Sequence, residues 1–172
     1  MFSKADIEKY FNAEKSESGL FMTIGIAGIV IAIIFFFFLK TEFYKGAAIP
    51  LAAIGLLLGI VGYTVYKRSD NDRKQNVYAY DMNPSELKEK EIPRMQTVMK
   101  NFILYRWIEI VLVAAGVGLY FYFIRDIKHD FWRGLGIGLT VMALLALTAD
   151  YFAEKRGHVY LKGLISFTTK NS

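Results

Sequence analysis

Residues 19–39 read GLFMTIGIAGIVIAIIFFFFL, a run of twenty-one residues without a charged side chain. As an α-helix this run would span about 30 Å, which is the thickness of the hydrocarbon core of a bilayer. Three further apolar runs of similar length follow at about residues 46–66, 102–124 and 131–152. The sequence therefore predicts an all-α integral membrane protein, in which residues 1–172 form a single four-transmembrane-helix antiparallel bundle.

The composition agrees with this class and argues against several others. Of the 172 residues, 54% are hydrophobic and none is cysteine. Without cysteine the chain has no disulfide framework and no thiolate ligand for zinc or an iron–sulfur cluster. Neither a His-Glu-x-x-His motif nor a pair of aspartates within the spans occurs, so we expect no enzyme, no metal and no cofactor.

The distribution of basic residues predicts the orientation. Fifteen Lys and Arg residues fall in the N-terminal arm, the central loop and the C-terminal tail, against five in the two short loops between paired helices. Because basic segments stay in the cytoplasm, we expect both termini there and the protein in the cytoplasmic membrane, as in a bacterial inner membrane. Anionic lipid headgroups then account for the net charge of +5, and no nucleic acid is expected as a partner.

The polar segments outside the spans are expected to be loops and short surface helices. The central loop, residues 67–101, begins with Ser69-Asp70-Asn71-Asp72, which predicts a polar turn, and contains Asn83-Pro84, which is typical of a helix start. No helix-breaking residue follows Pro93, so we expect the third helix to begin two or three turns before its apolar run. The N-terminal arm begins with a variant capping box at Ser3 and predicts either a helix lying on the membrane surface or a frayed arm. Gly157 predicts the end of the fourth helix, within a juxtamembrane tail over residues 153–172.

A stripe of small residues runs along the second span. Their spacing of four, three, four and three places them on one face of a helix: Ala48, Ala52, Gly55, Gly59 and Gly62. In a membrane, small residues let helix backbones approach closely. This small-residue ridge therefore predicts a helix-packing surface, either within the bundle or against a partner protein or a second copy of the chain.

Three charged residues lie near the cytoplasmic ends of the third and fourth spans: Arg106, Glu109 and Asp150. Counting residues from the span ends places Arg106 and Asp150 at similar depth, so we predict an ion pair between them with Glu109 close by. This charge cluster is interpreted either as a structural clamp or as a proton or cation site centred on Glu109.

These patterns leave several functions open. The first expectation is a protein that acts by protein–protein interaction within the bilayer, as a subunit of a membrane complex or as an immunity protein against a membrane-inserted toxin. The alternative is a small oligomeric transporter or channel that uses the charge cluster. An enzyme acting on lipid, with Glu109 as its base, is a third possibility.

Overall fold

A computed structural model describes residues 2–170, and every regular element in that range is helical. The first long helix, α1 (Lys4–Ile33), continues into a π-helical turn, η1 (Ile34–Leu39). The other elements, in chain order, are α2 (Glu42–Met82), α3 (Pro84–Glu86), the π-helical turn η2 (Leu87–Glu91), α4 (Ile92–Phe123), the 3₁₀ turn η3 (Ile127–His129) and α5 (Asp130–Lys170). The structure thus contains four helical rods that are long and apolar enough to cross a membrane.

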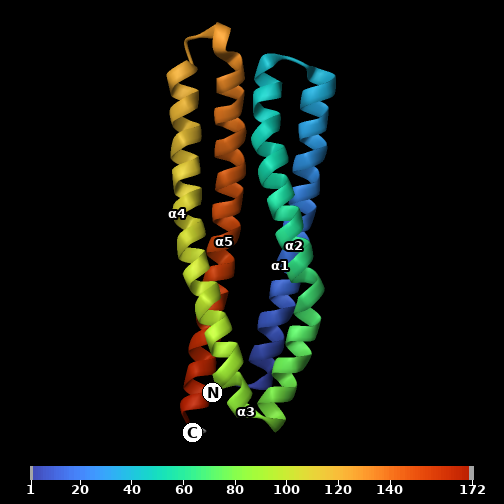
Figure 1. Ribbon diagram of the computed structural model, residues 1–172, viewed down its shortest axis with the longest axis vertical. Helices are drawn as coiled ribbons and strands as arrows, with labels where there is room; N and C mark the ends of the chain where they lie inside the picture. Colours follow the sequence, from blue (N-terminus) through green and yellow to red (C-terminus); the bar gives the residue numbers. More distant parts are fainter. Residues whose placement is uncertain (1, 171–172) are drawn as a thin grey trace.

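The four rods form two antiparallel hairpins, α1 with α2 and α4 with α5. Figure 1 shows the hairpins side by side, with both ends of the chain at the same end of the molecule. The hairpins meet mainly through α2 and α5, whereas α1 and α4 have little contact with each other. The predicted antiparallel arrangement of four long helices is therefore confirmed within the described residues.

The molecule divides along its length into two halves of different chemistry. The apolar half consists of residues 19–39, 46–66, 102–124 and 131–152, and the polar half of residues 2–18, 67–101 and 153–170. In the apolar half, many large apolar side chains are exposed; Phe121 and Val111, for example, are 64% and 63% exposed. The side chains that are both largest and most completely buried all belong to the polar half: Phe11, Ile7, Leu87, Met95, Leu164 and Ser69.

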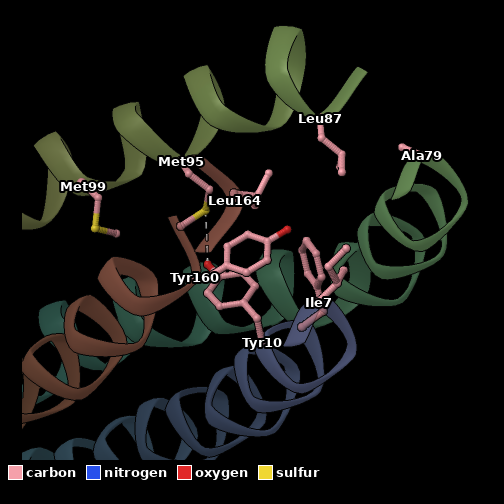
Figure 2. Packing of buried hydrophobic residues seen from close by; sticks show 9 residues of the cluster. Ile7, Tyr10, Ala79, Leu87, Met95, Met99, Tyr160 and Leu164 are labelled. Atoms are coloured by element: carbon pink, nitrogen blue, oxygen red, sulfur yellow. Dashed lines mark hydrogen bonds between the residues drawn. The ribbon is translucent and has the colours of Figure 1, made fainter. Parts of the chain in front are cut away.

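The polar half is a helical bundle with its own hydrophobic core. Figure 2 shows the centre of this core, where the rings of Tyr10 and Tyr160 stack with centroids 4.0 Å apart. The hydroxyl of Tyr10 donates a hydrogen bond to Sδ of Met95, at 3.5 Å. Side chains from all four rods complete the cluster, among them Ala79 of α2 and Leu164 of α5. Burial of apolar surface from water is the main force that can stabilise such a core.

This bundle corrects the prediction of a polar turn at residues 69–72, whereas the predicted extension of the third helix below residue 102 is confirmed, since α4 begins at Ile92. Helix α2 continues without interruption through the polar residues around Ser69 and ends only at Met82. The polar side chains are used in contacts with α1 rather than in a turn: Lys15 pairs with Asp70 at 2.5 Å, and Ser69 donates to Glu14 at 3.0 Å. The predicted break at Asn83-Pro84 is confirmed, since Asn83 precedes a helix that has Pro84 at its first position.

The terminal segments also differ from the predictions, because both are continuous parts of the long helices α1 and α5. The capping box at Ser3 is confirmed, but residues 4–18 are the first turns of α1 itself and not a separate surface helix. Gly157 does not end α5, which runs on to Lys170. Instead it lies against the side chain of Met99, where a larger residue would collide with the terminal methyl group. The predicted tail over residues 153–172 is thus helical as far as Lys170, and residues 171–172 lie outside the described part of the chain.

Candidate functional site

A cavity of about 450 Å³ lies between the two hairpins. The end of the cavity that is nearer to the hairpin loops is formed by Ile54, Leu112 and Ala143, which are all close to the middle of their apolar segments. From there it extends into the polar half, as far as Tyr10 and Arg68. We call this space the inter-hairpin cavity. Its volume falls within the range of about 300–1,000 Å³ that is usual for ligand pockets.

Each of the four rods gives one face to the cavity, and the lining changes character along its length. The part inside the apolar half is lined mostly by aliphatic and aromatic side chains, including Phe21, Ile54, Leu58, Val61, Ile108, Leu112 and Ala146. The charged lining residues lie in the polar half or in the adjoining part of the apolar half: Glu14, Glu17, Arg68, Glu109, Asp150 and Arg156. The cavity is therefore amphipathic, with an apolar wall and a charged floor.

On the floor, the two arginines are paired with the two glutamates of α1. A guanidinium nitrogen of Arg68 lies 3.9 Å from Oε1 of Glu14. Burial of the Glu14 carboxyl raises its pKa, and the nearby positive charge of Arg68 opposes that shift. Arg156 forms a hydrogen-bonded ion pair with Glu17, which joins α5 to α1 across the space between the hairpins.

Glu109 and Asp150 have no such partner. Glu109 is only 9% exposed, and its Oε2 atom is fully buried without a hydrogen bond. Asp150 makes no hydrogen bond and no ion pair with any of residues 2–170, and its charge acts repulsively on Glu109. A buried carboxylate without a counter-charge is costly, because it has lost its water and gained nothing in exchange.

The predicted ion pair between Arg106 and Asp150 is not formed. Arg106 instead pairs with Glu154, one helical turn further toward the polar half, with NH1 3.1 Å from Oε2. A long arginine side chain can extend along the helix surface toward polar surroundings, which brings it to Glu154 and leaves Asp150 free. Asp150 lies between the inter-hairpin cavity and a second hollow of about 440 Å³, on the α4–α5 hairpin, which Arg106 and Glu154 also line.

Much of the small-residue ridge is taken up inside the chain. A Cβ atom at Gly55 would lie 2.9 Å from the backbone oxygen of Gly25, and one at Gly62 would lie 2.7 Å from that of Ser18. Gly59 contacts the same helix, since a Cβ at Gly25 would lie 2.6 Å from its nitrogen. The remaining two residues of the ridge, Ala48 and Ala52, are buried and half-buried respectively. A Cβ at Gly59 itself would meet no atom within 4 Å, so a partner would have to displace α1 to reach Gly55 and Gly62 but not to reach Gly59.

Four floor residues were not expected at the site: Glu14, Glu17, Arg68 and Arg156. A signal for Arg156 is present in the sequence, because Ala146, Asp150 and Ala153 follow one helical stripe and Arg156 is its next member. The predicted stripe stops at Ala153, although the predicted helix extends as far as Arg156. The other three, Glu14, Glu17 and Arg68, carry no comparable signal, since their role depends on how the helices meet.

Between the cavity and the hairpin loops, close backbone contacts between α2 and α5 bring the hairpins together. Gly138 packs on the backbone oxygen of Ala47, where a Cβ would lie 2.7 Å away, and Gly134 packs on the backbone of Phe43. The cavity is thus closed toward the hairpin loops. The described residues contain no group of three or more His, Cys, Asp or Glu side chains placed to hold a metal ion. Comparison of the chain with protein families, with curated proteins and with solved structures found no match.

Proposed function

We propose that this protein is an integral protein of the cytoplasmic membrane, with its apolar half in the bilayer and both termini in the cytoplasm. The outward-facing apolar side chains of that half support the first part, because lipid would cover them. The second part is supported by the polar half, which carries fifteen of the twenty-one Lys and Arg residues. The polar half would then be a small cytoplasmic bundle built on the ends of the membrane helices.

The orientation can be tested by cysteine labelling, because the natural chain has no cysteine. We expect a single cysteine at Lys128, in the short turn η3, to react with a membrane-impermeant maleimide added outside intact cells. A cysteine at the exposed Ser85 should react only after the cells are permeabilised. The reverse pattern would contradict the proposed orientation.

We infer that the protein binds a small amphipathic molecule in the inter-hairpin cavity. The observation that carries this proposal is a single cavity that extends from the middle of the apolar half into the polar half, with an apolar wall and a charged floor. Several lining side chains are exposed on the outside of the bundle, among them Leu57, Val61 and Tyr105. A ligand could therefore enter sideways, from the cytoplasmic leaflet of the membrane.

The other functions considered have less support. A partner protein docking along the whole small-residue ridge would compete with α1, which already packs on Gly55 and Gly62. A channel needs a continuous path, and the backbone contacts at Gly134 and Gly138 close the space above the cavity. Transport through a second conformation would begin with binding, so the inter-hairpin cavity is the first feature to test.

Filling the cavity should remove ligand binding. Ala146→Phe places a ring in the cavity lining, whereas Ala115→Phe adds the same ring at an exposed position of α4. Binding can be followed in lipid nanodiscs by energy transfer from Trp107 and Trp132 to diphenylhexatriene or to its trimethylammonium derivative. We expect saturable binding of at least one probe to fall about tenfold or more in Ala146→Phe.

The Ala115→Phe variant should bind as the natural protein does, because its added ring would face lipid. The binding proposal fails if neither probe shows a saturable signal, or if both phenylalanine variants bind alike. Thermal unfolding of each variant in mild detergent distinguishes a filled cavity from a disrupted fold.

A further inference from the structure

We propose that the ligand of the inter-hairpin cavity is an organic cation, an ammonium group on an apolar body, held between Glu109 and Asp150. This inference rests on the proposed binding function and adds the chemical class of the ligand. The charges that line the cavity, the burial of Glu109 and the extent of the apolar wall support it.

The lining of the cavity has an excess of negative charge. It contains four carboxylates and two guanidinium groups. The guanidinium groups of Arg68 and Arg156 are already paired with Glu14 and Glu17. These two pairs neutralise the floor, so that a ligand cation would not be repelled there. The two remaining carboxylates, on Glu109 and Asp150, have no cation opposite them.

The burial of Glu109 makes this excess significant. A solvated carboxylate needs no partner, but Glu109 is more than nine-tenths buried, lines the cavity, and has one oxygen without any hydrogen bond. In surroundings of low polarity, a positive group placed beside two carboxylates gains far more than it would in water. A ligand that supplies this positive group would satisfy Glu109 and relieve its repulsion with Asp150.

The apolar wall indicates an organic cation rather than a metal ion. Only two unpaired carboxylates face the cavity, and residues 2–170 hold no group of three metal-ligating acidic, His or Cys side chains. Beyond Glu109, the wall continues through Leu112 and Ile54 to the middle of the apolar half. An apolar body attached to the ammonium group would cover these side chains, while a bare ion would leave them facing empty space or water.

The test compares two probes of nearly the same shape that differ in charge. Glu109→Gln and Asp150→Asn each remove one negative charge while keeping the size of the side chain. We expect each variant to weaken binding of trimethylammonium-diphenylhexatriene by about ten- to a hundredfold, which is the effect of losing one charge-assisted contact. Binding of uncharged diphenylhexatriene should change by less than about threefold, since its contacts are apolar.

Two comparisons keep the result interpretable. Glu89→Gln removes the same charge from an exposed position in the polar half and should leave both probes unaffected. Because Glu109 has no partner to lose, Glu109→Gln should unfold in mild detergent at the same temperature as the natural protein or higher. Any lost binding then reflects the cavity and not the fold.

The inference is overturned if the cationic probe binds to Glu109→Gln and Asp150→Asn as tightly as to the natural protein. It is also overturned if each variant loses affinity for the cationic and the uncharged probe to the same extent. In either case Ala146→Phe would still report whether the cavity binds a ligand at all. Failure of the cation inference is thus distinguishable from failure of the proposed binding function, which would appear as indifference of both probes to Ala146→Phe.

Discussion

Gly134→Ala is expected to force the two hairpins apart at their loop end. The backbone of Gly134 lies directly on the carbonyl of Phe43, and Gly46 lies in the same way on the carbonyl of Phe131, so that α2 and α5 touch through main-chain atoms. A methyl group at Gly134 would occupy the place of a backbone atom, which cannot rotate away as a side chain can. Adding a methylene group to a well-packed core usually costs about 1–3 kcal/mol, and we expect Gly134→Ala to lower the free energy of unfolding by more than this.

Two measurements can detect this effect. Thermal unfolding in mild detergent reports the loss of stability, and spin labels at Thr41 and Lys128, in the two hairpin loops, report the distance between the hairpins. Gly118→Ala is the control, because a Cβ at Gly118 meets no atom within 4 Å. There the better helix propensity of alanine should leave the protein as stable as before or slightly more so. Equal stability of the two variants would show that the hairpins do not meet through Gly134.

The four long helices could be predicted from the sequence because each contains an apolar run that few other structures can accommodate. Residues 19–39, for instance, are too long and too uniformly apolar for a strand or a loop. The boundary at Asn83-Pro84 was equally clear, since the Asn-Pro pair is a local signal that does not depend on neighbouring helices.

The polar half could not be predicted in the same way. The sequence shows that Ile7, Tyr10 and Phe11 share one side of a helix, but an apolar stripe fits a membrane surface as well as another helix. The structure places these side chains against Tyr160 and Leu164 of α5, about 150 residues away along the chain. Hydrophobic periodicity shows which face of a helix is apolar, but not which distant helix packs against that face.

The candidate site was predicted in part, for a related reason. Depth along the helix axis predicts Arg106, Glu109 and Asp150 near one level, but it gives no direction around the axis. The structure turns Asp150 toward the inter-hairpin cavity and pairs Arg106 with Glu154 outside it. What the sequence suggested as one balanced charge cluster is thus a satisfied ion pair beside two carboxylates that lack a counter-charge.

Both halves are built from the same four rods, yet they are stabilised differently. The apolar half relies on close backbone contacts at glycines such as Gly25 and Gly116. In the proposed membrane, lipid would remove any advantage of burying apolar side chains between the helices. The polar half relies on large buried side chains such as Phe11 and Met95, as soluble proteins do. The inter-hairpin cavity lies where one kind of packing gives way to the other.

Leu164→Asp should therefore unfold the polar half and leave the apolar half in place. Leu164 is 0% exposed and lies in the core formed with Ile7, Met95 and Tyr160. The substitution removes a buried aliphatic group, which alone costs about 2–5 kcal/mol. It also places an unpaired carboxylate in an apolar core, at a further cost of several kcal/mol. The sum is comparable with the whole stability of a small domain, about 5–15 kcal/mol.

Hydrogen exchange in lipid nanodiscs can resolve the two halves. In Leu164→Asp, amide exchange should accelerate throughout residues 2–18, 67–101 and 153–170, while residues 19–39 and 131–152 remain protected, because helices in lipid keep their backbone hydrogen bonds. Ile165→Asp is the control, since the side chain of Ile165, next to Leu164 in the sequence, is 42% exposed and a charge there can remain in water. If Leu164→Asp exchanged no faster than Ile165→Asp, the polar half would have no core of its own. If protection were lost over the entire chain, the two halves would instead unfold as one cooperative unit, and the separate stabilisation argued from their packing would be wrong.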